Sequence, residues 1–205
     1  MKNQKQRMIH GLLYRASDKE LRADNRRRKA ALKAFHAAES DEEGSLILGQ
    51  LFKSTQGYFK IEPPFYCDYG SNITLGADFY ANTDCIFLDV APITIGDNVM
   101  FGPRVSLYTA SHPIDSVIRS NGVEFAKPIV IEDNVWLGGN VVVNPGVTIH
   151  ENVIIGSGSV VTKDIEANVI AAGNPCRVIR KITGEDTVYW QNQLDQYYQE
   201  TGEKR

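Results

Sequence analysis

Three features that define other protein classes are missing from this sequence of 205 residues: a long apolar run, a secretory leader and patterned cysteines. No apolar stretch approaches the roughly 18 residues of a membrane-spanning helix, and the opening MKNQKQRMIHGLLYRAS lacks the apolar core of a signal peptide. The cysteines Cys67, Cys85 and Cys176 are odd in number and follow no spacing pattern, which disfavours a disulfide framework or a cysteine-based zinc site. Hydrophobic residues make up 42% of the chain and charged residues 23%, which excludes disordered and collagen-like classes. We therefore expect a globular, cytoplasmic protein with no membrane partner.

Basic residues are concentrated at the N-terminal end. Residues 1–33 contain 11 Lys and Arg residues against three acidic ones, although the whole chain has a formal net charge of −3. The excess centres on Arg26-Arg27-Arg28-Lys29, but neither interleaved aromatic residues nor a DNA-binding motif accompanies it. We interpret the run as the solvated face of a helix, or as a surface that meets an acidic neighbour, and expect no nucleic-acid partner.

The first 60 residues favour helices. Ser17-Asp18-Lys19-Glu20 fits a capping box, with Ser17 as the N-cap residue and Glu20 three residues later. Ser40-Asp41-Glu42-Glu43 is a second box, and we expect Gly57 to end the helix that it opens. The sequence therefore predicts an N-terminal helical segment over residues 1–60.

A repeat of six residues runs through the second half of the chain. From residue 131 to 166 the hexads read IEDNVW, LGGNVV, VNPGVT, IHENVI, IGSGSV and VTKDIE. The first position of every hexad is aliphatic, and the same phase appears upstream at Ile95, Phe101 and Leu107. An α-helix requires a period of about 3.6 and a simple strand a period of about 2, so a period of six indicates a short strand followed by a corner.

Asparagine marks the corners of these repeats. The segments IGDNV, IEDNV and IHENV place Asn98, Asn134 and Asn152 at the same step, and Asn tolerates the positive φ that a tight corner requires. Three hexads then form one triangular coil of a parallel β-helix, and the stacked coils bury a continuous aliphatic core. The alternative is a set of short antiparallel strands with accidental spacing. We predict the β-helix over residues 61–182, an excursion loop where the phase breaks at 108–128, and a short C-terminal helix or tail over 183–205.

Seven segments carry a family resemblance: GLLYRASDKEL (11–21), CDYGSNI (67–73), FYAN (79–82), LYTASHPID (107–115), VWLGGNVVVNPGVTI (135–149), VTKD (161–164) and AAGNPCRVIR (171–180). Together they resemble the hexapeptide-repeat acyltransferases, in particular their maltose and galactoside O-acetyltransferase branch. The resemblance implies a mainly β fold, a left-handed parallel β-helix, and a homotrimer with each active site between two subunits. It also implies transfer of an acetyl group from acetyl-CoA to a sugar hydroxyl, for example of maltose or glucose.

The excursion loop carries the candidate catalytic group, His112. An imidazole that titrates near neutral pH takes a proton from an alcohol and returns it to a leaving group. Without the resemblance, a histidine that only anchors the loop is the favoured interpretation; by resemblance, His112 is the general base of a direct transfer. Glu124 either orients the imidazole or is a surface carboxylate. A covalent route through Cys67 or Cys85 is less attractive, because no familiar local pattern pairs a histidine with either.

The resemblance also implies an acceptor site. It assigns Asp68 and Asn82 to sugar binding and allows Tyr80 as an apolar wall, and their carboxylate and amide groups suit hydroxyl recognition. Asn82 and the backbone N–H of Gly139 are the candidates for stabilising the oxyanion. The alternative for Asp68 and Asn82 is turn chemistry at solenoid corners. The galactoside enzymes carry an acceptor-binding aspartate that aligns here with Ala16, a departure that favours the maltose-type relatives.

Acetyl-CoA is the implied co-substrate, and no metal is expected. Small residues suit the pantetheine arm and arginines suit the phosphates, although a solvated basic edge is the alternative for the two arginines. Zinc enzymes on a similar scaffold use three histidines, and the four histidines of this chain have no ligand spacing. The residues that correspond to CoA-contacting positions are Gly139, Ser157, Thr162, Lys163, Arg177 and Arg180.

Three functions stay open at this point. The first is a CoA-dependent sugar O-acetyltransferase, or the same enzyme with a non-sugar or oligosaccharide acceptor. The second is a zinc-dependent hydratase, against which the missing histidine set argues. The third is a non-catalytic β-helix scaffold, against which His112 and its intact loop argue.

Overall fold

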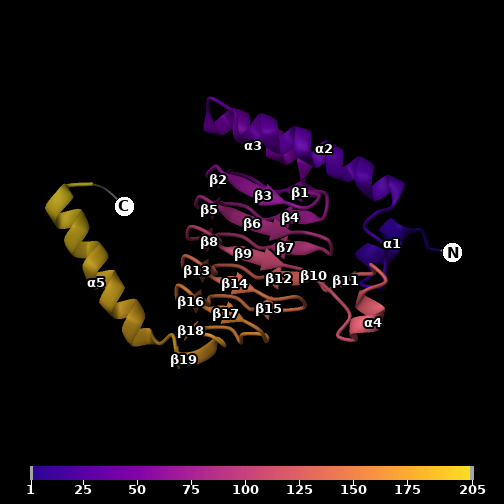
Figure 1. Ribbon diagram of the computed structural model, residues 1–205. Coiled ribbons are helices and arrows are strands. Elements are labelled where there is room, and N and C mark those ends of the chain that lie inside the picture. The colour runs from indigo at the N-terminus through magenta and orange to yellow at the C-terminus, as the bar shows by residue number, and fades with distance from the viewer. Residues whose placement is uncertain (1, 204–205) are drawn as a thin grey trace.

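The central part of the chain is a solenoid of short parallel strands that form three faces (Figure 1). The computed structural model describes residues 2–203. The first face contains β1 (Ser54–Thr55), β4 (Ile73–Leu75), β7 (Ile93–Ile95), β12 (Ile129–Ile131) and β15 (Thr148–Ile149). The second contains β2 (Phe59–Ile61), β5 (Phe79–Ala81), β8 (Met100–Phe101), β13 (Trp136–Leu137), β16 (Ile154–Ile155), β18 (Val169–Ala172) and β19 (Arg177–Lys181). The third contains β3 (Phe65–Cys67), β6 (Cys85–Leu88), β9 (Ser106–Tyr108), β14 (Val142–Val143) and β17 (Val160–Val161).

The hexad pattern explains the core of this solenoid. The first and fifth positions of the six hexads, from Ile131 to Ile165, are all buried. In the upper coils the core is aromatic: Phe65 meets Phe87 edge-on with ring centroids 5.1 Å apart, and Phe79 meets Phe101 at 5.2 Å. Each fully buried side chain of this size stabilises the fold by about 1.5–3 kcal/mol. The predicted mainly β fold with stacked parallel coils is confirmed.

The asparagine corners also behave as the sequence predicts. Asn98, Asn134 and Asn152 adopt φ values of 56°, 59° and 54°. This left-handed backbone turns the chain from one face of the solenoid to the next, and Asn adopts it at less cost than most residues.

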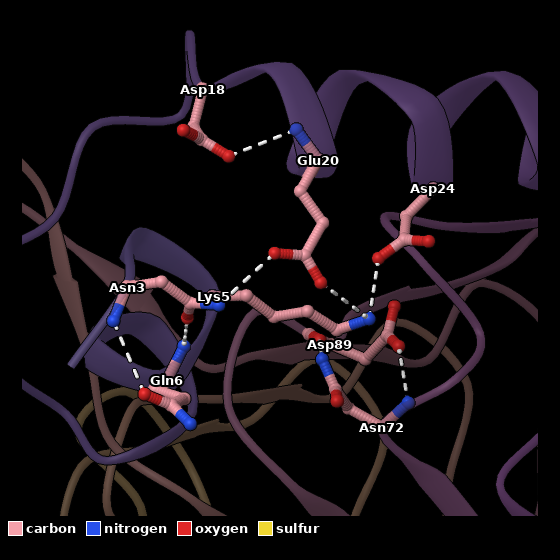
Figure 2. A network of polar contacts seen from close by, with 8 residues as sticks. All are labelled: Asn3, Lys5, Gln6, Asp18, Glu20, Asp24, Asn72 and Asp89. Atoms are coloured by element: carbon pink, nitrogen blue, oxygen red, sulfur yellow. Dashed lines mark hydrogen bonds and ion pairs between the residues drawn. The ribbon is translucent and has the colours of Figure 1, made fainter.

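The helix α1 (Gln4–Ile9) lies at the side of the stack next to α2, whereas α2 (Lys19–Phe35) and α3 (Asp41–Leu51) cover the first coil (Figure 1). Their buried side chains include Leu32, Phe35, Leu48 and Leu51, which join the solenoid core. Lys5 ties α1 to α2, because its Nζ lies 2.7 Å from Asp24 (Figure 2).

Two details of the predicted helix ends are wrong. The N-cap of α2 is Asp18 and not Ser17, because the Asp18 carboxylate accepts the N–H of Glu20 at 2.9 Å. The helix α3 ends at Leu51 and not near Gly57, because Phe52 already has extended backbone angles. The other predicted cap is confirmed: the hydroxyl of Ser40 accepts the N–H of Glu43 at 3.2 Å.

Between β9 and β12 the chain leaves the stack. This excursion contains β10 (Ala110–Ser111), the short helix α4 (Ser116–Arg119) and β11 (Phe125–Ala126), and β10 pairs with β11 in antiparallel fashion. Its tip is apolar and exposed at Ile114 and Val117.

The C-terminal segment is longer and more regular than the sequence predicts. After β19, which pairs antiparallel with β18, the helix α5 (Gly184–Thr201) runs for 18 residues outside the solenoid (Figure 1). None of its residues is buried, and Trp190 and Tyr197 are exposed. Among residues 2–203, no helix combines the length and apolarity needed to cross a membrane.

Candidate active site

A pocket of about 430 Å³ lies where the N-terminal segment with α2, the third face of the solenoid and the excursion meet. Segments far apart in the sequence build it, because the fold brings residues 14–29, 68–69 and 110–124 to one place. We call it the cap pocket. Its lining residues are Tyr14, Ala16, Leu21, Arg22, Asn25, Arg26, Lys29, Asp68, Tyr69, Val90, Ala110 and Glu124.

Tyr14 and Glu124 clamp the N-terminal segment to the excursion. Their backbones form an isolated antiparallel bridge with N–H to O distances of 2.9 and 3.0 Å. The Tyr14 hydroxyl also donates to the Glu124 carboxylate at 2.8 Å. Burial and this carboxylate raise the pKa of Tyr14, so the phenol stays a hydrogen-bond donor.

Asp68 is the second carboxylate of the cap pocket. Burial raises the pKa of Asp68, the charge of Glu124 adds to the rise, and Arg28 opposes it. The Arg28 Nε donates to the backbone oxygen of Asp68 at 3.1 Å, which ties α2 to this corner. The neighbouring Tyr69 has its pKa raised to about 12, mainly by burial. The pocket therefore presents two carboxylates and two protonated phenols, groups that form hydrogen bonds with hydroxyls.

The basic run of α2 faces this pocket in part. Arg22, Arg26 and Lys29 recur at helical spacing, share one side of α2 and line the cap pocket, although they remain exposed. In the described part of the chain none of the three forms an ion pair. Exposure without an ion pair fits the solvated helix face, one of the two interpretations drawn from the sequence, and a meeting with acidic groups stays a prediction.

His112 follows β10 directly and is exposed. Ala110, two residues earlier, lines the cap pocket, whereas His112 is outside its lining. Within residues 2–203 the hydrogen-bond partner of the Glu124 side chain is Tyr14 and not His112. An orienting role for Glu124 on the imidazole therefore stays a prediction.

Other predicted residues lie along a different corner of the solenoid, the one after the strands of the second face. The N–H groups of Asn82, Gly102, Gly138 and Gly156 each donate to the next coil, at 2.8 to 3.0 Å, and so stack in one column. A Cβ on Gly102 would lie 2.6 Å from the nitrogen of Gly139, and the coils therefore require small residues here. Gly139 and Ser157 belong to this column of corners. Tyr80 precedes it, half-buried on β5 and outside the cap pocket.

The remaining CoA candidates lie toward the C-terminal end. Thr162 and Lys163 follow β17 and are exposed. They lie at the corner after the third face, the same corner from which the excursion leaves an earlier coil, after β9. Arg177 donates to the backbone oxygen of Cys176 at 2.8 Å. Both terminal nitrogens of Arg180 bind the Asp186 carboxylate at 2.7 Å, which lowers the pKa of Asp186 well below its usual range. Arg180 is thus already engaged by the first turn of α5.

Comparison with known proteins agrees with this architecture. Residues 7–57 match the maltose acetyltransferase hexapeptide capping motif, and residues 128–163 match the bacterial transferase hexapeptide (six repeats). The galactoside O-acetyltransferase of Escherichia coli K12 is 48% identical over 155 residues, which cover 76% of this chain and 76% of that protein. The chain belongs to the hexapeptide-repeat acetyltransferases.

Two solved structures place this acetyltransferase more closely. The maltose O-acetyltransferase from Clostridium difficile 630 matches with a TM-score of 0.88 and 48% identity, over 89% of this chain and 98% of that chain. A galactoside acetyltransferase in complex with coenzyme A matches with a TM-score of 0.87 and 41% identity, over 91% and 94%. The resemblance read from the sequence is confirmed.

The structure joins some predicted residues and separates others. Asp68 and Glu124 share the cap pocket, whereas Asn82, Gly139 and Ser157 lie at another corner of the same chain. Sequence reasoning missed Tyr14, Tyr69 and the cations of α2 as pocket residues. Tyr14 and Tyr69 belong to segments that carry the family resemblance, which was the available signal. Across residues 2–203 no group of three His, Cys, Asp or Glu side chains is arranged to hold a metal ion.

Proposed function

We propose that this acetyltransferase transfers an acetyl group from acetyl-CoA to a hydroxyl of a sugar such as maltose or glucose. The dependence on acetyl-CoA is supported by the family and by the structure of a related galactoside acetyltransferase in complex with coenzyme A. The sugar acceptor is supported above all by one observation, the cap pocket, where Asp68 and Glu124 lie with Tyr14 and Tyr69. This set of acceptors and donors suits a polyhydroxylated ligand.

The cap motif itself builds that pocket. Residues 7–57 match a capping motif named for maltose acetyltransferases, and α2 and Tyr14 belong to it. Ala16, where galactoside enzymes are expected to carry an aspartate, also lines the pocket. A methyl group in that place leaves one hydrogen-bonding group fewer for the acceptor, in keeping with a maltose-type preference.

His112 is the general base of the proposed reaction. Its imidazole takes the proton of the acceptor hydroxyl as that oxygen bonds to the thioester carbonyl carbon. The tetrahedral oxyanion then receives hydrogen bonds from the N–H of Gly139 and the side chain of Asn82. When the carbon–sulfur bond breaks, the imidazolium returns its proton to the thiolate of CoA, so that a sugar ester and free CoA leave.

The active site is proposed to form between two subunits of a homotrimer. Within one chain, His112 projects from one corner of the solenoid, whereas Asn82, Gly139 and Ser157 lie along another. A cyclic assembly brings two different corners of identical chains together three times. A cytoplasmic location completes the proposal, and the free, buried thiols of Cys67, Cys85 and Cys176 support it.

The test is thiol release from acetyl-CoA with a panel of sugars, other alcohols and amines, followed by mass analysis of the acceptor product. We expect release with maltose or glucose and a gain of one acetyl group on the sugar. His112→Ala is expected to lower kcat by about 10² or more, the contribution of a general base. His150→Ala is the matched control, because His150 pairs with Glu132 on the solenoid surface.

The unfolding temperature of His112→Ala should stay at the wild-type value, since the side chain is exposed. Undiminished turnover in this variant would overturn the mechanism. Transfer to amines but to no hydroxyl would overturn the sugar acceptor, and no transfer to any acceptor would favour a scaffold protein.

A further inference from the structure

A buried carboxylate outside the pocket lining holds the segment that carries Asp68. Asp89 follows β6 and has no exposed surface. Its Oδ1 accepts the N–H groups of Asp68 and Tyr69 at 2.9 and 2.8 Å, and its Oδ2 accepts the N–H of Asn72 at 3.2 Å. The Asn72 side chain donates in return to the Asp89 backbone oxygen at 2.6 Å, and Figure 2 shows the contact between the Asp89 carboxylate and the Asn72 backbone. The chain between 68 and 72 is therefore fixed to Asp89 at both ends.

The held segment forms one wall of the cap pocket. Asp68 and Tyr69 both line the pocket, and so does Val90, the residue after Asp89. A shift of the backbone at 68–69 would move a carboxylate and a phenol of the pocket together. Asp89 itself does not line the pocket, so its influence on a bound acceptor passes through these residues.

A second buried polar side chain continues this connection to the excursion. The Thr109 hydroxyl accepts the N–H of Ala91 at 2.9 Å and donates to the backbone oxygen of Leu88 at 2.6 Å. Thr109 directly precedes Ala110, which lines the cap pocket. His112 lies three residues after Thr109. The turn at residues 88–91 thus lies between the Asp68 segment and the root of the loop that carries His112.

Burying the Asp89 carboxylate at this position costs free energy. Burial raises the pKa of Asp89 to about 7, and hydrogen bonds from backbone N–H groups oppose the rise. Within residues 2–203 no Lys, Arg or His forms an ion pair with it. A buried carboxylate with no counter-charge has a desolvation cost, which the N–H donors offset in part. Two acceptor oxygens are, however, what a tight turn with several converging N–H donors needs.

We propose that Asp89 is a positioning residue for the acceptor: its two oxygens set the backbone of residues 68–72 and thereby the place of Asp68 and Tyr69 in the cap pocket. This inference rests on the proposed function of that pocket. It assigns Asp89 to acceptor binding and separates it from acetyl-CoA binding, since its hydrogen bonds go to Asp68, Tyr69 and Asn72 and not to the predicted CoA-contacting residues.

The test is Asp89→Asn, which keeps one acceptor oxygen and puts an NH₂ donor in place of the other. Initial rates are measured against acceptor at saturating acetyl-CoA, and against acetyl-CoA at saturating acceptor. We expect the acceptor KM to rise roughly tenfold, because a buried N–H loses its partner. We expect kcat and the acetyl-CoA KM to stay within about twofold of wild type.

Two further variants keep the test decisive if Asp89→Asn folds poorly. Asn72→Ala removes the bond from the Asn72 side chain to the Asp89 backbone and should raise the acceptor KM in the same direction by a smaller factor. Asp97→Asn is the matched control: Asp97 also accepts a backbone N–H, from Ala77 at 2.7 Å, but lies outside the cap pocket. It should leave both KM values unchanged.

A rise confined to the acceptor KM in Asp89→Asn and Asn72→Ala supports the inference. Equal changes in both KM values, or a lower unfolding temperature with unchanged kinetics, would show a merely structural Asp89 and leave the proposed function intact. No transfer by the wild-type enzyme to any acceptor would instead overturn the proposed function, and the inference with it.

Discussion

The two ends of the solenoid carry helices of similar length, but only the helix at the first coil packs against the stack. At the first coil, α2 has 17 residues and buries Leu21, Leu32 and Phe35. At the last coil, α5 has 18 residues and buries none, although it carries Trp190 and Leu194. Apolar side chains alone therefore do not decide burial. The helix α2 crosses the first coil and closes that end of the stack, whereas α5 leaves the stack beyond β19 and leaves the other end open (Figure 1).

This difference separates two parts of the proposed site. At the cap end, one chain completes a pocket from α2, the Asp68 segment and the excursion. At the other end, Arg177 and Arg180 lie on the exposed strand β19 beside an unpacked helix. We take the closed end as the acceptor side and the open end as the side of the CoA nucleotide.

Stability measurements on matched leucines should show the largest contrast between the two ends. Leu48 in α3 is fully buried, and Leu48→Ala is expected to lower the free energy of unfolding by about 2–5 kcal/mol through the cavity it leaves. Leu194 in α5 is exposed, and Leu194→Ala should change it by no more than about 0.5 kcal/mol. Urea unfolding at one fixed protein concentration measures both.

The same pair of variants could also show that the two ends do not differ in packing. A cost for Leu194→Ala as large as that for Leu48→Ala would show that α5 packs against another surface in solution. The open end would then be closed in the assembled protein.

Steady-state kinetics should show a smaller contrast between the two ends, as changes in the KM of one substrate and not of the other. Asp68→Ala is expected to raise the acceptor KM about tenfold, the scale of one hydrogen bond to a charged group, and to leave the acetyl-CoA KM unchanged. Arg177→Ala is expected to do the reverse, because an arginine near a phosphate stabilises the bound nucleotide. Arg104→Ala, an exposed arginine that faces Asp84 at 3.7 Å, is the control with no change in either value. If each substitution raised both KM values together, the division into two sides would be wrong.

Much of the fold is predictable because the position of a residue within the hexad predicts whether its side chain is buried in the core or lies at a corner. An aliphatic residue at Ile131 and every sixth position after it has to face one core, and Asn134 and its equivalents have to turn the chain. The helix ends are less certain in sequence, since Ser17 and Asp18 are both good caps and only the backbone decides between them. The length of α5 was not predicted because its packing gives no pattern: no face of it is buried.

The candidate site is predictable only in pieces. The sequence marks Asp68, Glu124 and His112 in separate segments, but no spacing reveals that Tyr14 bonds to Glu124 across 110 residues of chain. Nor does it reveal that Asp89 lies beneath Asp68, because an aspartate after a strand resembles any other corner residue. Convergence of this kind is a property of the stacked coils and not of a local motif.

Amide hydrogen exchange with each substrate present would show whether the acceptor and the nucleotide of the coenzyme bind at different ends of the solenoid. We expect coenzyme A to protect residues 136–163 and 177–181, and the sugar that proves active to protect residues 14–29, 68–72 and 124. Protection of the cap pocket by coenzyme A, with no change near Gly139, Ser157 or Arg177, would contradict this expectation.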